Sequence, residues 1–405
     1  MNVKKIMILG ASVYQVPLIK TAKRMGLYTI VSSIAGNYPG FSYADKVYYI
    51  DTTDKEAILD ICQKEGIDGI CTSGTDVAVA TIGYVNEKMG LSGISEKAAE
   101  RACNKYAMKS AFKEGGVSAS GFIKATSLEE AKRAASVIGY PVVVKCVDSS
   151  GSRGISAVNE EKDLEAAYDQ AIGYSRQNYV LIEEMLGGVE IGVDGLVKDG
   201  EVVLFAPHHK YTYKYKGITI PAGHSFPYRC SEKVYSEINH QITLAVKALG
   251  IDNSAFNSDV FVDGECVYII EMGGRAGATG IPELISMHYG FDFYEKMLMN
   301  ALGEDMGLPT EFKSQPCMSK LLMSPVDGVI SKIDHDAIER IKTKGYEISL
   351  DYSAGQSVEE MHNGTTRIGQ IIATNDDEEV VNAAMDEVYD AIYIGEESMR
   401  SLWKK

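Results

Sequence analysis

Short apolar runs alternate with amphipathic segments over the first hundred residues. The run at 4–9 is followed by Gly10 and predicts a buried strand, and the helical spacing at 16–26 ends at a glycine. Further strands and a helix are predicted at 27–32, 46–50, 56–66 and 68–72. Because alternating strands and helices build parallel sheets covered by helices, we predict a Rossmann-like domain whose ligands bind at the carboxyl ends of its strands.

The pattern changes in the second hundred residues. Two helical segments and an apolar strand are predicted at 98–114, 128–138 and 141–145. Short apolar stretches broken by Gly and acidic residues between 179 and 203 favour an antiparallel sheet. Further on we predict a helix at 232–249 and a hairpin at 259–271, whose turn signal is Asp263–Gly264.

With 405 residues the chain is too long for one ordinary core, so we predict an α/β and α+β multidomain protein. The predicted parts are a Rossmann-like domain at 1–100, a small subdomain at 101–187, a larger subdomain at 188–311 and a C-terminal α+β lobe at 312–405. The lobe shows no cluster of residues that suggests chemistry, so the candidate site is sought in the first three parts.

Composition narrows the class of protein. Hydrophobic residues make up 45% and charged residues 24% of the chain, a balance typical of soluble globular proteins. The net charge of -16 opposes a nucleic-acid partner, because phosphate neutralisation requires clustered Lys and Arg. The cysteines lack CxxC spacing and fit a reducing cytoplasm better than a disulfide framework or a zinc site. The N-terminal apolar run is too short for a signal peptide, and no stretch has the length of a membrane helix, so we expect no membrane partner.

A lysine and a loop of small residues follow one another after the strand at 141–145. Lys145 ends the strand, and the loop at 146–154 has the sequence CVDSSGSRG. Small side chains let backbone amides approach phosphate oxygens, while the lysine supplies positive charge. The segment is a candidate phosphate site, although an ordinary solvent loop is the alternative and the Walker A sequence is absent.

The segment at 180–190, VLIEEMLGGVE, joins an apolar strand to two glycines flanked by acids. Such a segment could offer main-chain groups to an adenine edge and a carboxylate to ribose hydroxyls. A surface strand that ends in a solvated acidic turn is the alternative.

The most specific segment covers residues 257–280. Two strands joined by a turn carry Asp259 and Glu271 at neighbouring positions, and Arg275 follows in a glycine-rich loop. Two carboxylates can hold Mg²⁺ through oxygen ligands while nucleotide phosphates complete its coordination. Exposed acids on a hairpin edge are the alternative, but Glu271 ends an apolar run, and a buried carboxylate is costly unless it is paired or metal-bound.

In their order and content these three segments resemble the ATP-grasp superfamily of carboxylate–amine ligases. The resemblance covers residues 1–300 and includes the sequence NKYAMKSAF around Lys105. It implies a pre-ATP-grasp domain at 1–100 and an ATP-grasp fold made of the two following subdomains, and the C-terminal lobe is weakly similar to those of the amino-acid ligase and biotin-carboxylase-like branches. It also implies ATP and Mg²⁺ as cofactors, with Mn²⁺ as an alternative metal.

The resemblance implies a role for each candidate residue. Asp259 and Glu271 would hold the metal, and Arg275 would hold the acyl phosphate, with Lys145 as a second catalytic cation. The residues implied to bind the nucleotide are Lys105, Lys145, Ser150, Gly151, Ser152, Gly154, Glu183, Glu184, Leu186 and Glu190.

One position departs from the family pattern. Many members have Asn two residues after the second metal acid, where this chain has Gly273. One side-chain ligand is therefore missing, which puts the number or tightness of the metal ions in doubt. His224 resembles a histidine found beside the acyl phosphate in dipeptide-forming members and is a third catalytic candidate, with a purely structural histidine as the alternative.

The substrates are left open by the sequence. An amino-acid or related small-molecule ligase that joins a carboxylate to an amine is the first interpretation. The alternatives are a purine-pathway enzyme similar to phosphoribosylglycinamide synthetase or formyltransferase, a carbamoyl-phosphate-synthase-like protein and a non-catalytic nucleotide-binding regulator. A substrate phosphate could bind at the turn of Gly10 and Ser12, before a helix N-terminus, with Thr75 at a neighbouring strand end. A homodimer is expected because dimers are common in the family that the chain resembles.

Overall fold

The computed structural model describes residues 3–148, 154–215 and 218–404 of the chain. These residues form two compact units, each assembled from several stretches of chain. Unit 1 comprises Met1–Phe205, Cys230–Ala276 and Glu295–Met306, and unit 2 comprises Ala206–Arg229, Gly277–Tyr294 and Gly307–Lys405. The chain first passes from unit 1 to unit 2 within strand β10 (Glu201–Tyr215).

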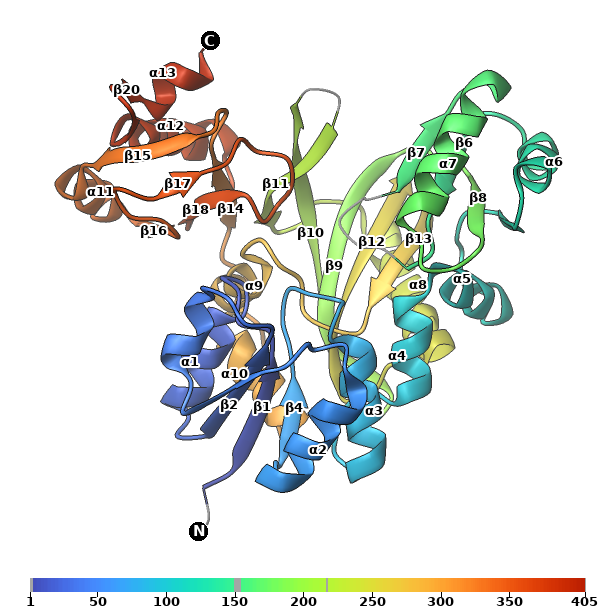
Figure 1. Ribbon diagram of the computed structural model, residues 1–405, viewed down its shortest axis with the longest axis horizontal. Helices are drawn as coiled ribbons and strands as arrows, with labels where there is room; N and C mark the ends of the chain where they lie inside the picture. The colour runs from blue at the N-terminus through green and yellow to red at the C-terminus, as the bar shows by residue number, and fades with distance from the viewer. Residues whose placement is uncertain (1–2, 149–153, 216–217, 405) are drawn as a thin grey trace. The chain divides into compact units, whose positions relative to one another are not determined.

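A parallel sheet with the strand order β3-β2-β1-β4 forms the N-terminal part of unit 1 (Figure 1). Its strands are β1 (Lys5–Leu9), β2 (Tyr28–Ser33), β3 (Lys46–Tyr49) and β4 (Gly69–Cys71). Its helices are α1 (Val16–Arg24), the 3-10 turn η1 (Pro39–Tyr43), α2 (Lys55–Glu65) and α3 (Val79–Met89). Ile8 of β1 lies opposite Cys71 of β4, so the turns after these two strands leave the sheet at the same edge. The predicted Rossmann-like arrangement is confirmed.

The single helix predicted at 98–114 is divided in two, which corrects the sequence analysis. Helix α4 (Glu96–Cys103) ends at Asn104, whose backbone is extended, and α5 (Lys105–Glu114) begins at the next residue. The side chain of Asn104 accepts a hydrogen bond of 3.0 Å from the N–H of Ala107 and so caps α5. The break places Lys105 in the first turn of the new helix.

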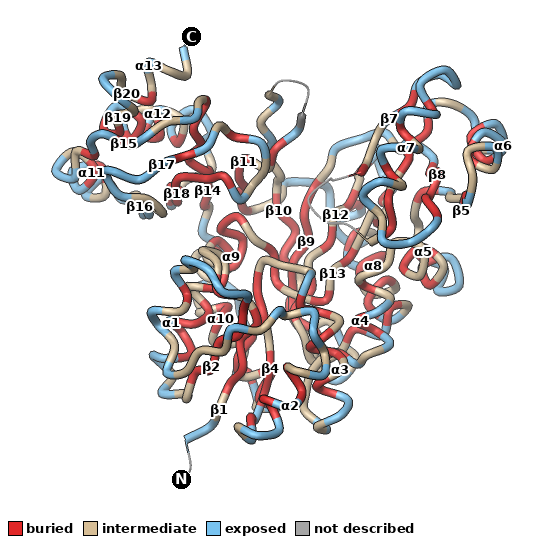
Figure 2. Tube along the Cα trace, viewed as in Figure 1, coloured by how far each residue is buried: buried red, intermediate tan, exposed pale blue. Residues whose placement is uncertain are grey.

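A second sheet, antiparallel and of the order β5-β8-β6-β7, follows in unit 1. Its strands and helices are β5 (Phe122–Ala125), α6 (Leu128–Ile138), β6 (Val142–Lys145), β7 (Ile155–Val158), η2 (Glu161–Asp163), α7 (Leu164–Tyr174) and β8 (Val180–Glu184). Val142 and Val144 of β6 are buried in its apolar core, which Figure 2 shows as red segments between α6 and α7. Because side chains alternate along a strand, Lys145 points to the opposite face.

The last part of unit 1 contains three antiparallel strands in the order β13-β12-β9. Its elements are β9 (Val189–Lys198), α8 (Glu232–Leu249), β12 (Ser254–Asp263), β13 (Cys266–Gly273) and α10 (Phe293–Ala301). The predicted hairpin is confirmed, since β12 and β13 are joined at Gly264, whose φ of 59° suits a tight turn. Helix α8 packs on β13 and on α5, which brings α5 close to the hairpin.

Unit 2 is an α+β body that includes residues 312–405, the range of the predicted C-terminal lobe, together with two earlier stretches of chain. Its strands follow the orders β10-β11-β14-β18-β16 and β17-β15-β19-β20. Its remaining elements are β11 (Ile218–Phe226), α9 (Ile281–Tyr289), β14 (Cys317–Met323), β15 (Gly328–Ile333), α11 (His335–Lys342), β16 (Tyr346–Leu350), β17 (Ser357–Val358), β18 (Arg367–Ala373), α12 (Glu378–Asp390), β19 (Ile392–Ile394), β20 (Glu397–Ser398) and α13 (Met399–Trp403). Ile371 of β18 and Val388 of α12 are fully buried in its core.

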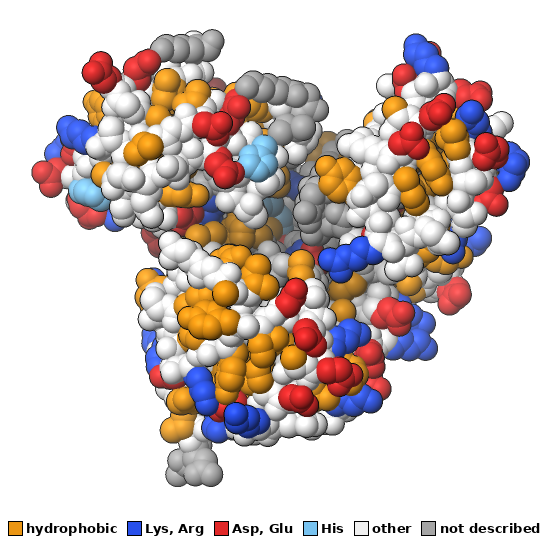
Figure 3. Space-filling model, in the orientation of Figure 1, with side chains coloured by type: hydrophobic (Ala, Val, Ile, Leu, Met, Phe, Trp, Pro, Cys, Tyr) orange, Lys and Arg blue, Asp and Glu red, His pale blue; other side chains and the backbone are white. Residues whose placement is uncertain are grey.

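Charged side chains of both signs are interspersed over the face of the molecule shown in Figure 3. No helix in the described part of the chain is long and apolar enough to cross a membrane.

Candidate functional site

Two carboxylates face each other across the β12–β13 hairpin. Asp259 lies directly opposite Glu271 in the register of the two strands, and a bulge follows Asp259. Directly opposed residues point to the same face of a sheet, with their Cβ atoms about 5 Å apart. Among the described residues no cluster of three or more His, Cys, Asp or Glu side chains is arranged to hold a metal. A cation at this carboxylate pair would therefore need further oxygen ligands from a nucleotide or from water.

Lys105 supplies positive charge beside this pair. Its Nζ lies 3.4 Å from Oε2 of Glu271, and the Lys105 side chain is 14% exposed against 44% for Glu271. Burial alone would lower the pKa of Lys105, but the negative charge of Glu271 raises that pKa above its ordinary value. Lys105 is therefore a cation at neutral pH, close to where a bound phosphate would meet the carboxylates.

Lys145 belongs to a buried ionic cluster around Glu183. The Nζ atoms of Lys145 and Lys109 lie 2.9 and 3.5 Å from Oε2 of Glu183. Ser120 Oγ donates to the same oxygen at 2.8 Å and accepts from Lys109 at 2.8 Å. Burial would raise the pKa of Glu183, but the two lysines hold it below its ordinary value. The carboxylate therefore stays charged and fixes the end of Lys145.

Lys109 was not among the residues selected from the sequence. It follows Lys105 by one helical turn on α5, so both lysines lie on the same face of that helix. The spacing of the two lysines was the sequence signal that could have identified Lys109. It is a weak signal, because lysines on an amphipathic helix usually face solvent. In this structure the Lys109 side chain is buried, with 1% exposed.

The burial of Lys109 predicts a pH-dependent contribution to stability. Desolvation lowers its pKa from 10.5 to about 8 in the folded protein. Between these two values the unfolded chain holds more protons on this lysine, so its contribution to the free energy of unfolding should rise with pH. Urea denaturation between about pH 8 and pH 10.5 should show that the free energy of unfolding of wild type rises with pH relative to that of Lys109→Met. The matched control is Lys97→Met, at an exposed position of α4; curves that stay parallel for Lys109→Met would contradict the prediction.

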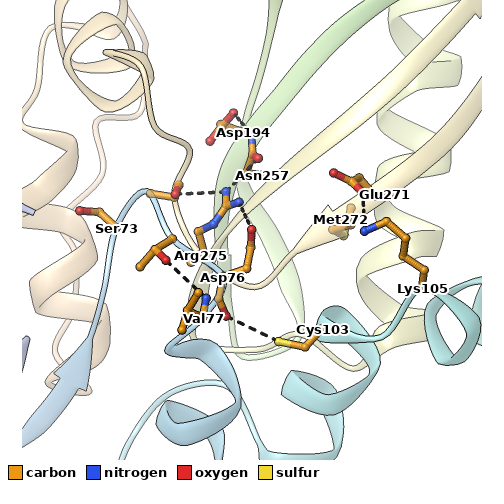
Figure 4. A network of polar contacts seen from close by, with 12 residues as sticks. Ser73, Asp76, Val77, Cys103, Lys105, Asp194, Asn257, Glu271, Met272 and Arg275 are labelled. Carbon is orange, nitrogen blue, oxygen red and sulfur yellow. Dashed lines mark hydrogen bonds and ion pairs between the residues drawn. The ribbon is translucent and has the colours of Figure 1, made fainter. Parts of the chain in front are cut away.

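Arg275 is held by residues from two parts of unit 1, the N-terminal part and the part with strands β9 and β12 (Figure 4). Its Nη2 donates to Asp76 Oδ2 at 2.7 Å, and its Nη1 donates to Asn257 Oδ1 at 2.9 Å. Asn257 in turn donates to the fully buried Asp194 at 2.8 Å. Burial would lower the pKa of Arg275, but Asp76 raises it above its ordinary value. The guanidinium is thus a fixed cation, and Asp76 is a second residue that the sequence analysis did not select.

The Asp76–Arg275 pair explains how Gly273 fits its surroundings. A Cβ atom at position 273 would lie 2.8 Å from Asp76 Oδ1 and 3.6 Å from the guanidinium carbon of Arg275. The carboxylate of Asp76 therefore occupies the space next to Gly273, where many ATP-grasp members carry the Asn side chain.

We expect Gly273→Ala to lower the free energy of unfolding by about 1 kcal/mol, because overpacking would push Asp76 away from Arg275. Chemical denaturation measures this change. Gly173→Ala on α7 is the control, since no atom lies within 4 Å of the added Cβ there. An equal change in the free energy of unfolding in the two variants would show that Asp76 can move aside without loss of stability.

The predicted substrate turn at Gly10 and Ser12 is closed by a side chain of its own helix. The backbone N–H and the hydroxyl of Ser12 both donate to Oε1 of Gln15, at 2.9 and 2.7 Å. The side-chain Nε2 of Gln15 donates to the backbone carbonyl of Ser73 at 2.5 Å. The turn after β1 is thereby tied to the loop after β4, in which Thr75 accepts a hydrogen bond of 3.4 Å from the N–H of Val77.

The remaining nucleotide candidates lie around β8 and β9. Glu184 ends β8, Leu186 follows it and Glu190 is the second residue of β9. Gly154 is buried with a φ of 67°, and its carbonyl accepts from the N–H of Cys146 at 2.9 Å. The residues Ser150, Gly151 and Ser152 lie outside the described residues. The roles of these residues remain predictions.

His224 belongs to unit 2, whereas the residues above belong to unit 1. It lies on β11 and is 3% exposed, and its Nε2 is 2.7 Å from Thr279 Oγ1. Burial lowers the pKa of His224 well below its ordinary value, so the ring is neutral. It could position a substrate by hydrogen bonding but not by charge.

Residues 138–283 match a protein-family model described as an ATP-grasp domain. The match contains both carboxylates, Lys145, Glu183 and Arg275. Together with the fold, it shows that the chain carries an ATP-grasp domain and confirms the resemblance drawn from the sequence.

More particularly, the chain is similar to ligases and to purine-pathway proteins. It is 25% identical over 374 residues to the L-arginine-specific L-amino acid ligase of Bacillus subtilis, covering 87% of each protein. It is 26% identical over 348 residues to the formate-dependent phosphoribosylglycinamide formyltransferase of Rhodococcus jostii, covering 80% of each. The solved phosphoribosylglycinamide synthetase of Anaerococcus prevotii matches with a TM-score of 0.80 and 25% identity, covering 98% of this chain and 100% of that one.

Proposed function

We propose that this protein is an ATP- and magnesium-dependent ligase that activates a small carboxylate as an acyl phosphate and joins it to an amine. The observation that carries the proposal is the opposed pair Asp259 and Glu271, with Lys105 3.4 Å from Glu271. Hard carboxylate oxygens next to a lysine suit a magnesium nucleotide. The similarity to an L-amino acid ligase supports an amino acid or related small molecule as substrate.

Asp259 and Glu271 would hold the metal ion, which supplies charge neutralisation for the phosphates. Lys105 and Lys145 would bind the phosphate oxygens, and Glu183 would keep Lys145 in place. Transfer of a phosphoryl group depends mainly on such fixed positive charge, because little covalent chemistry is left for the protein.

Arg275 would hold the acyl phosphate while the amine nitrogen attacks the carbonyl carbon. The C–O bond to phosphate then breaks, phosphate leaves and the amine loses its proton to solvent. A guanidinium has five N–H donors. Within the described residues Nη2 of Arg275 makes one hydrogen bond, to Asp76, so its second N–H can donate to a substrate oxygen while Arg275 keeps its partners.

A purine-pathway reaction is the second candidate function, favoured by the similarity to phosphoribosylglycinamide synthetase. For either function we propose a cytoplasmic location. We also retain the homodimer as a proposal.

The test is a screen of carboxylate and amine pairs for release of ADP from MgATP, with products identified by mass. We expect ADP and amide product in equal amounts for at least one pair. Turnover without metal, or ADP release that needs no amine, would contradict the proposed ligase.

A further inference from the structure

The edge of the parallel sheet where β1 and β4 end bears on which acceptor the proposed reaction uses. Ligands of such sheets bind at the carboxyl ends of the strands. The two turns at this edge are adjacent because Ile8 pairs with Cys71, and Arg275 is joined to the second turn through Asp76. This edge is therefore the natural place for the acceptor in the proposed reaction.

A phosphate at this edge would need free N–H groups before helix α1. The N–H of Ser12 is already donated to Gln15, and the N–H of Gly10 is donated to the carbonyl of Ser32 at 2.8 Å. The first turn of α1 contains Pro17, which has no N–H. Two N–H groups of this turn are therefore already used, and Pro17 offers none.

The uncharged side chain of Gln15 fills this turn. Its side-chain carbonyl takes the donors of Ser12, its amide is bound to Ser73, and the residue is only 2% exposed. A phosphate that displaced it would leave a buried carboxamide without hydrogen-bond partners, which is unfavourable.

The charge at the same edge also disfavours phosphate. In the proposed reaction Arg275 holds the acyl phosphate, and it is already paired with Asp76, whose side chain is 32% exposed, so it supplies no further positive charge for a second phosphate at this edge. The Gly74 N–H, which could otherwise serve an anion in the second turn, donates to the carbonyl of Ala276 at 3.0 Å. The partly exposed carboxylate would repel a phosphate and attract an amine in its ammonium form.

We propose that the acceptor is an amine without a phosphate group, such as a free amino acid, and that Gln15 excludes phosphoribosyl amines from the edge formed by β1 and β4. This inference rests on the proposed function and narrows it. It separates this chain from the purine-pathway proteins that it resembles in fold and sequence.

Ribose 5-phosphate is the binding probe, measured by calorimetry on the full chain. We expect no saturable binding to wild type and a gain of binding in Gln15→Ala, in which the donors of Ser12 are released. Gln15→Glu keeps an acceptor for Ser12 and adds negative charge, so it should bind no probe, and Gln170→Ala on the exposed face of α7 should behave as wild type. Saturable binding to wild type, or no gain in a folded Gln15→Ala protein, would overturn the proposed role of Gln15.

The acceptor screen keeps the two proposals apart. ADP release with amino acids but not with a phosphoribosyl amine supports the inference. ADP release with the phosphoribosyl amine overturns it and leaves the ligase function standing. No ADP release with any pair would overturn the ligase function and this inference with it.

Discussion

Replacing Glu271 by Gln is expected to lower the rate of ADP formation by about 10²–10³-fold. The substitution keeps the shape of the side chain but removes the charge that Asp259 and Glu271 together offer to a metal ion. It also removes the carboxylate that raises the pKa of Lys105. Burial then lowers the pKa of Lys105 without this compensation, which disfavours its charged form. Initial rates at saturating MgATP, and their dependence on the metal concentration, measure both effects.

The matched control for this variant is Glu265→Gln, in the turn of the same hairpin. Glu265 pairs with Lys233 at the surface, and their side chains are 65% and 70% exposed, so its charge should contribute little. Glu271→Gln should stay folded, with a small loss of stability from the unpaired Lys105, because the Glu271 side chain itself is 44% exposed. Wild-type turnover in a folded Glu271→Gln protein would show that no essential metal is held at this carboxylate.

The opposition of Asp259 and Glu271 could be predicted from sequence because its geometry is local. Asp259 and Glu271 lie on two strands joined by a short turn, so the alternating pattern and the turn signal fix which residues oppose each other. The strand that carries Lys145 was predictable for the same reason, since its apolar residues are consecutive and its core is formed by nearby elements.

Residues whose partners lie far along the chain escaped prediction. Asp76 bonds to Arg275 across 199 positions, and Gln15 bonds to Ser73 across 58. Neither sequence neighbourhood contains a pattern that identifies the partner, because the contact depends on how strands and loops are stacked. Gln15 changes the substrate interpretation most, since it fills the turn that looked suited to phosphate.

The break at Asn104 shows a different limit. Helical spacing continues across this residue, so hydrophobic periodicity alone favours one long helix. The local signal for a break is Asn itself, which is a good N-cap but also occurs within helices. The break decides where Lys105 points and therefore bears on the site.

The largest effect on stability is expected for Glu183→Ala. Glu183 is the shared partner of two lysines and of Ser120, and its side chain is 2% exposed. Its removal leaves Lys109 buried without a counter-charge, so the free energy of unfolding should fall by about 3–5 kcal/mol. Urea denaturation measures the loss, and Glu160→Ala, at an exposed surface position, should change stability by less than about 0.5 kcal/mol.

A double variant separates the charge of Glu183 from its volume. Replacing Glu183 by Leu and Lys109 by Met together removes both buried charges while keeping similar side-chain volumes, which is often close to neutral for buried ion pairs. The double variant should therefore be more stable than Glu183→Ala, with a coupling between the two sites of about 0.5–3 kcal/mol.

Lys145 is 12% exposed and can turn its ammonium group towards solvent, so it should tolerate the loss of its partner better than Lys109. Strictly additive losses at the two positions would show that the cluster contributes no mutual stabilisation and that Lys145 is positioned by other contacts.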